Sequence, residues 1–285
     1  MIYTQEQLHA IQEEQYGVLN ATAEILQRYN IPYILAFGSM LGAVRHQGFI
    51  PWDDDIDIAI MRKDYDRFLA VAQEELGDAY CVQNTDTDKN CLNIGFTKIR
   101  KVGTVHESKG QKHLDRCKGV GIDVFPFDPM PEKRWKQVLL YHLVELIKLT
   151  SSAKLKYNYY AFRPVKKYAT LVASALLTPI SISRLGKIDT WLKTRTSDKS
   201  ALVDWISYAA YKTGGRMQKE WFYDRIYVPF GNQNHPIIRE YKNHLIRTFG
   251  EDFMTPPPVE KRVPHPIINL KIAGVPEIKD GKQVK

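Results

Sequence analysis

Residues 37–60 have the sequence FGSMLGAVRHQGFIPWDDDIDIAI. Four carboxylates fall within residues 53–57, and the apolar residues Ile58, Ala59 and Ile60 follow directly. A solvated acidic loop would not lead into such an apolar run, which is typical of a buried strand. The acids are therefore predicted to lie at an edge of the folded core.

The spacing of these acids predicts a metal site. In an extended strand, Asp53, Asp55 and Asp57 share one face and Asp54 points to the other. Carboxylates on one face raise one another's pKa unless a cation neutralises them, and hard oxygen ligands favour Mg²⁺, Mn²⁺ or Ca²⁺. An EF-hand is excluded, because the loop that starts at Asp53 lacks the required Gly and Glu at its sixth and twelfth positions.

A phosphate-binding turn is predicted just upstream. Residues 31–37 are typical of a buried strand, and Gly38-Ser39 then turns the chain into a short helix over residues 40–45. Backbone N–H groups and a hydroxyl at such a turn suit a phosphate. A Gly-Ser pair alone is usually only a turn, and an Asp run alone is usually a solvated loop. Their combination with two strands favours a functional site.

Two signatures of known proteins are similar to this sequence. Gly38-Ser39 followed by Asp55-Ile56-Asp57-Ile58 resembles the signature of the nucleotidyltransferase superfamily. Residues 42–57, GAVRHQGFIPWDDDID, resemble the LicD family, which has distant fukutin-type relatives. The similarity continues in residues 121–128, GIDVFPFD, and in residues 254–258, MTPPP, which precede Lys261, Arg262 and His265. It covers residues from about 30 to 128 and 241 to 265.

This resemblance implies a fold, an activity and a donor. The implied fold is of the α+β class, with a nucleotidyltransferase-like core in which helices flank a small mixed sheet. The family comprises phosphotransferases that move a phospho-alcohol, typically phosphocholine from CDP-choline, onto glycans. For this chain it implies a CDP-alcohol donor, Mg²⁺ or Mn²⁺ as cofactor, and a lipid-linked glycan acceptor of lipopolysaccharide, capsule or teichoic acid biosynthesis.

The implied metal-binding and catalytic residues are acids. Asp55 and Asp57, together with Asp53, would hold one or two Mg²⁺ ions that bridge the phosphates of the donor. Asp123 would share a metal and orient or deprotonate the acceptor hydroxyl. Physical reasoning also gives Asp123 a partner, because it interrupts the apolar residues 119–125 and an unpaired buried carboxylate costs several kcal/mol. The metal is the expected partner.

The implied phosphate-binding residues surround these acids. Gly38 and Ser39 would contact the transferred or leaving phosphate, and positive charge would come from Arg45, His46, Lys98, Lys261, Arg262 and His265. Trp52 would offer an aromatic wall to the quaternary ammonium of choline, although a tryptophan beside a strand more often serves packing. Lys98 lies in the second strand of a hairpin predicted over residues 80–105, and an edge lysine that discourages strand pairing explains it equally well.

Charge divides the chain into three predicted parts. Residues 1–132, the catalytic core, hold 13 Lys or Arg and 20 Asp or Glu. Residues 133–200 hold 14 Lys or Arg and only 3 Asp or Glu, although the whole chain of 285 residues has a net charge of +8. We therefore expect a basic, mainly helical insertion over residues 133–215. Residues 216–285 would complete the active site.

The basic block allows three interpretations. It contains an apolar helical pattern at 138–149, a group of Lys, Tyr and Arg at 154–167, and an uncharged apolar run at 168–182. That run is about 15 residues long, short of the roughly 20 that cross a bilayer. Peripheral contact of residues 133–200 with an anionic membrane is one interpretation. A packed helical insertion and a single-strand nucleic-acid surface are the others, and nucleic acid is not expected.

The remaining segments complete the expected architecture. Helices are predicted over residues 4–29, with a Thr4–Gln7 capping box, over 62–77 and over 236–249, and strand or loop over 221–230. Asp128 is expected in a turn or cap. The three cysteines have no paired or metal-type spacing, and no secretory leader is apparent. These features predict a cytoplasmic protein that acts at the inner face of the membrane.

Two other functions stay open at this stage. A nucleotidyltransferase would attach a nucleoside monophosphate to a small molecule and release pyrophosphate, and the metal site does not separate the two, because in both reactions the acceptor attacks a phosphorus of a nucleotide donor. A non-catalytic membrane- or polymer-binding module would keep the fold without the chemistry. The acids at all three motif positions, Asp55, Asp57 and Asp123, argue against the second alternative.

Overall fold

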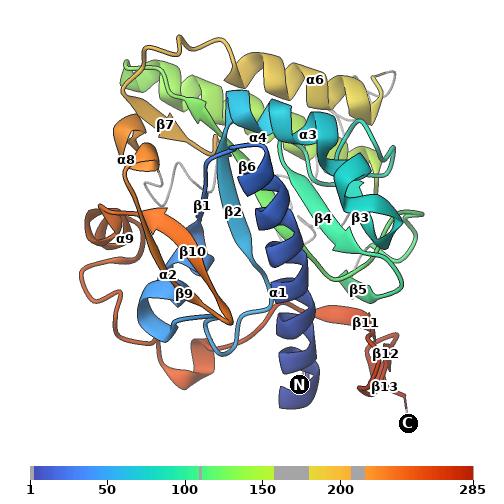
Figure 1. Cartoon of the computed structure of the whole chain (residues 1–285). Helices are drawn as coiled ribbons and strands as arrows, with labels where there is room; N and C mark the ends of the chain where they lie inside the picture. The colour runs from blue at the N-terminus through green and yellow to red at the C-terminus, as the bar shows by residue number, and fades with distance from the viewer. Residues whose placement is uncertain (1–2, 109–110, 157–179, 207–215, 285) are drawn as a thin grey trace.

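The computed structural model describes residues 3–108, 111–156, 180–206 and 216–284 (Figure 1). A mixed sheet lies at its centre, with five strands in the order β1 (Tyr33–Leu35), β2 (Asp57–Met61), β6 (Gly121–Pro129), β4 (Thr97–Lys101) and β3 (Tyr80–Gln83). The central pair β2 and β6 is parallel, and the other neighbours are antiparallel. Strands β7 (Leu202–Asp204) and β8 (Met217–Gln218) extend the sheet at the far end of β6.

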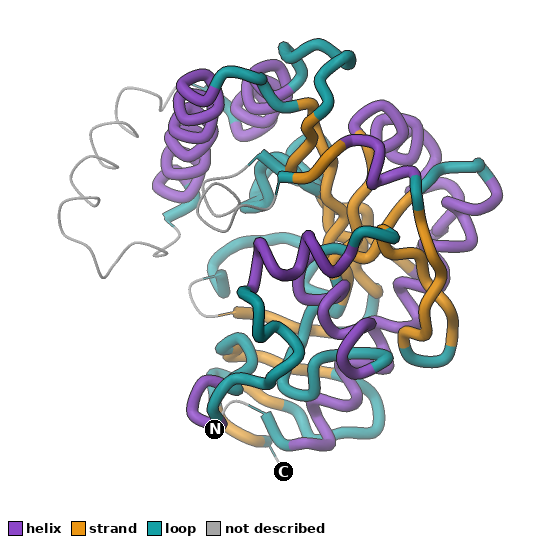
Figure 2. Tube along the Cα trace, turned by 90° about the vertical axis from the view of Figure 1, so that its left-hand side faces the viewer, coloured by secondary structure: helices purple, strands orange, loops and turns teal. Residues whose placement is uncertain are grey.

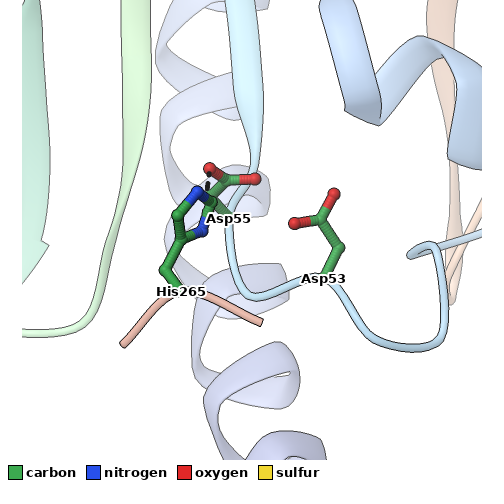
Figure 3. A group of neighbouring side chains, drawn as sticks. All are labelled: Asp53, Asp55 and His265. Carbon is green, nitrogen blue, oxygen red and sulfur yellow. Dashed lines mark ion pairs between the residues drawn. The ribbon is translucent and has the colours of Figure 1, made fainter. Parts of the chain in front are cut away.

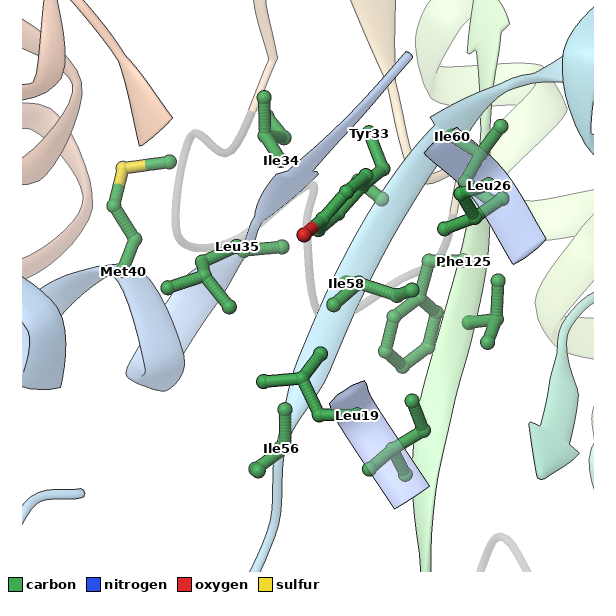
Figure 4. Packing of buried hydrophobic residues seen from close by; sticks show 14 of the residues in the cluster. Leu19, Leu26, Tyr33, Ile34, Leu35, Met40, Ile56, Ile58, Ile60 and Phe125 are labelled. Atoms are coloured by element: carbon green, nitrogen blue, oxygen red, sulfur yellow. The ribbon is translucent and has the colours of Figure 1, made fainter. Parts of the chain in front are cut away.

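Helix α1 (Gln5–Arg28) covers one face of this sheet. Its capping box forms as expected, because the Thr4 hydroxyl accepts from the Gln7 amide and the Gln7 side chain accepts from the Thr4 amide. Leu19 and Leu26 project from the helix against buried residues of β2 (Figure 4). Burial of each such side chain contributes about 1.5–3 kcal/mol. The central sheet is thereby fixed beneath the helix.

Helix α2 (Phe37–His46) connects the antiparallel strands β1 and β2. The chain reverses tightly after it, since Gln47 adopts a left-handed conformation with φ of 57°. A Cβ atom on Gly42 would lie 2.4 Å from the Gly48 carbonyl oxygen, so only glycine allows this approach. The close return sets the acidic loop, residues 51–56, beside the first turn of α2.

Other helices surround the sheet. Helix α3 (Arg62–Leu76) follows β2 and leads through η1 (Gly77–Ala79) into β3. Helices α4 (Arg134–Lys154) and α6 (Ile182–Lys193) lie at the upper end of the molecule, opposite the two chain ends (Figures 1 and 2). Among the described helices, none has the length and apolar character needed to cross a bilayer.

The C-terminal part wraps around the sheet in short elements. Helix α8 (Lys219–Tyr223) precedes the antiparallel pair β9 (Arg225–Phe230) and β10 (Gln233–Ile238), and α9 (Tyr241–Phe249) and η2 (Val259–Lys261) follow. A second sheet contains β5 (Val105–Ser108), β11 (Ile267–Lys271), β12 (Ile278–Lys279) and β13 (Lys282–Gln283). Its apolar residues pack against the first turns of α1. The C-terminal segment therefore runs past one end of the central sheet, beside the first turns of α1.

The sequence predicted the class of this fold correctly: helices flank a mixed sheet. The hairpin over residues 80–105 forms as β3 and β4, although its connection includes residues 92–96. Three local predictions were wrong. The strand around the acids begins only at Asp57, residues 236–238 belong to β10 and not to a helix, and Asp128 is a buried residue of β6. The apolar run at 168–182 and most of the Lys, Tyr and Arg group lie outside the described residues.

Candidate active site

Three charged residues form a row across adjacent central strands. Asp57 of β2 lies opposite Asp123 of β6, and Asp123 in turn lies opposite Lys98 of β4. Side chains at paired positions point to the same face of a sheet, so these groups converge. The Lys98 ammonium forms an ion pair with the Asp123 carboxylate. Lys98 is thus one partner of Asp123, and the metal that was expected beside the same carboxylate stays a prediction.

The other acids lie on the loop that enters β2. Asp53 and Asp55 are half-buried, and His265 approaches them from the segment before β11 (Figure 3). One ligand atom of each of these three residues lies within 4.8 Å of the other two. The His265 Nδ1 atom lies 3.9 Å from an Asp55 oxygen. The loop is irregular, yet it brings Asp53, Asp55 and Asp57 close enough for strong mutual repulsion.

Burial and mutual repulsion raise the pKa values of the acids in this cluster. Burial, followed by the charges of Asp55 and Asp54, raises the pKa of Asp53 to about 8. Burial and the neighbouring carboxylates Asp55 and Asp123 hold the pKa of Asp57 well above its ordinary value. Burial likewise raises the pKa of Asp55. A divalent cation would relieve this repulsion, and these oxygen donors are of the kind that Mg²⁺ and Mn²⁺ prefer. The residues fit the predicted metal.

Asp54 is buried between its neighbours, although the strand whose alternation was predicted to separate it from Asp53 and Asp55 begins only at Asp57. The Tyr3 hydroxyl donates to its carboxylate at 2.6 Å, and His265 Nδ1 lies 2.8 Å from the other carboxylate oxygen. Burial alone would raise the pKa of Asp54, but hydrogen bonds from His106, His265 and Tyr3 lower it below its usual range. The same hydrogen bond raises the pKa of His265 to about 9. Asp54 therefore holds a protonated His265 beside the acids.

Gly38 and Ser39 occupy the first turn of α2, one turn earlier than the predicted helix start. The Ser39 hydroxyl accepts a hydrogen bond from the Asp57 amide at 2.8 Å, and so it fixes the start of β2. A Cβ atom on Gly38 would lie 3.2 Å from an Asp53 carboxylate oxygen. The turn thus contacts the acids directly, which agrees with the predicted proximity of turn and acids.

A basic group lies next to the acidic loop. Arg45 Nε donates to His46 Nε2 at 2.9 Å, and the Arg45 and Arg262 guanidinium carbons lie 5.9 and 5.1 Å from the centre of the Trp52 ring. Burial and Arg262 lower the pKa of Arg45. Burial and Arg45 lower the pKa of His46. Trp52 therefore contacts two guanidinium groups of the protein itself, which disfavours a further cation on the same ring.

The structure thus places the predicted residues in two neighbouring groups. The acidic group contains Gly38, Ser39, Asp53, Asp55, Asp57, Lys98, Asp123 and His265, and the basic group contains Arg45, His46, Trp52 and Arg262. Lys261 is exposed in η2 and joins neither group among the described contacts. Tyr3 and His106 carried no signal in the sequence. They reach the site only because α1 and the second sheet pack at this end of the central sheet.

Such a site can bind a diphosphate and activate a hydroxyl. The acids provide hard ligands for a cation, and the basic group provides donors to phosphate oxygens. A carboxylate beside the metal site can accept a proton from an attacking hydroxyl. These are the parts that phosphoryl transfer requires.

A family model and known proteins are similar in sequence to this chain. Residues 30–148 match the family model described as LicD/FKTN/FKRP, nucleotidyltransferase domain. The chain is 29% identical over 262 residues to the lipopolysaccharide cholinephosphotransferase LicD of Haemophilus influenzae, with 88% of this chain and 92% of that protein covered. It is also 33% identical over 131 residues to an uncharacterized protein of Rickettsia typhi, with 40% of this chain and 42% of that protein covered.

Proposed function

We propose that this chain, whose residues 30–148 match the LicD/FKTN/FKRP family model, is a member of that family and transfers phosphocholine from CDP-choline to a hydroxyl of a surface-glycan precursor. The observation that carries this proposal is the row of Asp57, Asp123 and Lys98, with Asp53 and Asp55 beside it, inside the residues that match the family model. We assign β1, α2, β2, β6 and β4 to a nucleotidyltransferase-like core on the same grounds. The similar Haemophilus protein supports both the transferred group and the type of acceptor.

In this proposal, the acids hold the cofactor. Asp53, Asp55, Asp57 and Asp123 would be ligands of Mg²⁺ or Mn²⁺, which, when bound, neutralises charge on the donor phosphates. The raised pKa values of Asp53, Asp55 and Asp57 support this assignment, because a cation removes their mutual repulsion. His265 keeps its proton through Asp54 and contacts a phosphate oxygen of the donor.

The reaction is an in-line displacement at the phosphorus that carries choline. The acceptor hydroxyl oxygen forms a new bond to this phosphorus, the bond to the CMP oxygen breaks, and CMP leaves. Asp123 takes the hydroxyl proton, and Lys98 holds the Asp123 carboxylate in place through their ion pair. Arg45 and Arg262 bind oxygens of the leaving CMP phosphate, while the N–H groups of Gly38 and Ser39 face the donor.

The described part of the basic block supports contact with an anionic membrane. Trp135, Leu139, Leu143 and Leu146 form an exposed apolar stripe along α4, with Trp135 61% exposed. Lys136 lies over the Trp135 ring, and Arg195, which follows α6, lies over the half-exposed Trp191 ring of that helix. A groove of about 730 Å³ lies between α4 and the C-terminal end of α6, with Arg195 and Lys199 in its wall. Tryptophan beside basic residues is typical of interfacial surfaces.

Membrane contact is tested by sedimentation with vesicles. We expect binding to vesicles that contain phosphatidylglycerol at low salt, and little binding to vesicles of phosphatidylcholine alone. Replacement of Trp135 and Leu139 by serine should weaken binding to the anionic vesicles. Equal binding of the double variant and the unchanged protein would reject this surface.

The transferase activity is tested with a donor panel. Purified protein would be incubated with Mg²⁺, a lipid-linked glycan extract, and either CDP-choline, CDP-ethanolamine, CDP-glycerol, CDP-ribitol or a nucleoside triphosphate. We expect CMP from CDP-choline, and none from the Asp57→Asn variant. The Asp66→Asn variant is the matched control, because Asp66 is an exposed acid of α3. Release of pyrophosphate from a triphosphate would reject the phosphotransferase in favour of a nucleotidyltransferase.

A further inference from the structure

Two cysteines that are far apart in the sequence meet at the edge of the central sheet. Cys81 belongs to the edge strand β3, and Cys117 belongs to the segment before β6. The Cys81 thiol donates a hydrogen bond to the Cys117 sulfur, and both residues are partly exposed. Cys91, the third cysteine of the chain, is fully buried. The chemistry proposed above uses none of these thiols.

Hydrogen bonds hold the segment with Cys117 over the face of the sheet that carries Cys81. Cys81 of β3 lies opposite Arg100 of β4, so their side chains share a face, and Gln83 lies on this face two residues further along β3. Arg100 donates to the Gly119 carbonyl oxygen at 2.6 Å and to the Gln83 side-chain oxygen at 2.7 Å. The Gln83 amide nitrogen donates to the Cys117 carbonyl oxygen at 3.2 Å. The backbone contacts therefore place the two cysteines beside each other.

The surroundings of Cys117 favour its thiolate form. The hydrogen bond from Cys81, a hydrogen bond from the Gly119 N–H group and the charge of Arg100 outweigh burial and lower the pKa of Cys117 to about 6. The hydrogen bond to Cys117, together with burial, raises the pKa of Cys81, which therefore keeps its proton at neutral pH. The thiolate is the nucleophilic form of cysteine. The pair thus combines a reactive sulfur with a second thiol in contact with it.

Metal binding is another common use of neighbouring cysteines. Within the described parts of the chain, the one group of three or more side chains that could hold a metal ion is Asp53, Asp55 and His265. The cysteine pair belongs to no such group, and a structural zinc site needs four ligands. Redox chemistry is therefore the use that fits two thiols alone.

We propose that Cys81 and Cys117 form a peroxide-sensitive site that closes to a reversible disulfide. The Cys117 thiolate attacks one oxygen of hydrogen peroxide, the O–O bond breaks, and hydroxide leaves and takes up a proton to become water. The Cys81 thiol then attacks the sulfenic sulfur of Cys117, the S–O bond breaks, and the oxygen leaves as a second water with the Cys81 proton. The two sulfurs together lose two electrons, and one peroxide is reduced to two waters. A dithiol such as dithiothreitol restores both thiols.

The proposed redox site lies on the same face of the sheet as the acids. The row with Asp123 and Lys98 is followed, two residues along the strands, by the row with Arg100 and Cys81. A cavity of about 450 Å³ adjoins both rows, because Lys98 and Arg100 line it. The disulfide would tie the segment before β6, which also lines this cavity, to the edge strand. Oxidation would therefore act beside the candidate active site without consuming one of its residues.

Peptide mass spectrometry without reduction tests the disulfide. The protein would be treated at pH 7 with a dose of hydrogen peroxide that oxidises glutathione in the same buffer. We expect the peptides of Cys81 and Cys117 to be joined, to be lighter together by two hydrogen atoms, and to separate after addition of dithiothreitol. Cys91→Ser is the matched control and should leave the joined peptides unchanged. Reduced Cys81 and Cys117 after this treatment would overturn the proposal.

Single substitutions distinguish the roles of the two sulfurs. In Cys81→Ser, the sulfenic acid on Cys117 has no second thiol to react with, so we expect it to accumulate and to be trapped by dimedone. In Cys117→Ser, we expect oxidation of Cys81 to be at least about tenfold slower, because the Gly119 N–H group stabilises a thiolate only at position 117. Equal rates of oxidation in the two variants would overturn the assignment of Cys117 as the reactive residue.

The unchanged protein offers a test that does not depend on the folding of a variant. The rate at which iodoacetamide alkylates Cys117 should rise with pH through about 6. A rise only at about pH 8.5, as for an ordinary cysteine, would overturn the proposal. These measurements involve neither a nucleotide nor turnover, so they succeed or fail independently of the proposed function.

Discussion

Lys98 of β4 forms an ion pair with Asp123 of β6, and the two residues occupy paired positions on adjacent antiparallel strands. This pair compensates one acid of the site. The pKa values of Asp53, Asp55 and Asp57 are raised, so these three carboxylates lack comparable compensation. The site therefore combines one acid that has a cationic partner on the neighbouring strand with three acids whose repulsion a bound cation would relieve.

Replacement of Lys98 should impair catalysis more than folding. In Lys98→Met, the Asp123 carboxylate loses its partner and its fixed position, so we expect kcat/KM for CDP-choline to fall by about a hundredfold. Lys101→Met is the control, because Lys101 lies on the same strand and pairs with Glu14 outside the site. A similar loss of kcat/KM in both variants would contradict the role of Lys98.

Replacement of Asp57 should abolish activity and stabilise the protein. Asn at this position removes one charge from a repelling cluster, so without metal we expect Asp57→Asn to melt roughly 2–4 °C above the unchanged protein, which corresponds to about 1 kcal/mol. Asp66→Asn should change neither activity nor melting temperature appreciably. Loss of stability in Asp57→Asn would show that its carboxylate is not under repulsive strain.

Divalent cations should stabilise the folded chain. If Mg²⁺ binds the acids, saturation at about 100 times Kd adds about 2.7 kcal/mol to the free energy of unfolding. Thermal melting with and without Mg²⁺, and after addition of EDTA, measures this shift. The shift should be absent in Asp55→Asn, which removes a ligand, and present in Lys101→Met. A shift of equal size in Asp55→Asn would place the cation elsewhere.

Asp204 should make stability depend on pH. Burial raises the pKa of its carboxyl group from 3.8 to about 7, although the Tyr141 hydroxyl donates to it. Between these values the folded state binds more protons than the unfolded state, so this residue lowers stability as pH rises from about 4 to 7. Asp204→Asn should therefore raise the melting temperature at pH 8 and leave it unchanged near pH 4.

The Asp204 experiment has a simple control. Asp78 is an exposed residue of η1, and its replacement by Asn should alter melting equally at both pH values. If Asp204→Asn gave the same shift at pH 4 and pH 8, the carboxyl group would not exchange its proton in this range. The tyrosine hydrogen bond would then fix its charge state.

The sequence predicted those parts of the site that are formed by residues close together in the chain. The apolar run after Asp57 marked β2, and the Gly38-Ser39 pair marked the turn at its side. Asp123 stood out because a single acid interrupts an apolar strand. Each of these signals arises from a period of two residues or from a turn, which sequence displays directly.

The sequence could not predict the contacts between residues that lie far apart in the chain. Asp128 appeared to be a turn residue because it follows Pro126, yet Arg62 pairs with it through two hydrogen bonds inside the core. Gln15 lies in an ordinary helical pattern, and only the fold turns its amide towards Asp54 and Gly121. The partners of Asp54, which are Tyr3, His106 and His265, depend on the packing of α1 and the second sheet. No local pattern encodes such contacts.

The three partners of Asp54 are synthesised at different times. Tyr3, His106 and His265 are made in succession by the ribosome, and His265 emerges more than 200 residues after Asp54. Until then the nascent core carries Asp54 with His106 and Tyr3 but without His265, one of the three residues whose hydrogen bonds lower its pKa. N-terminal parts of a chain generally fold first during synthesis. The central sheet can thus begin to form early, whereas the site gains His265 only after the segment before β11 has been synthesised.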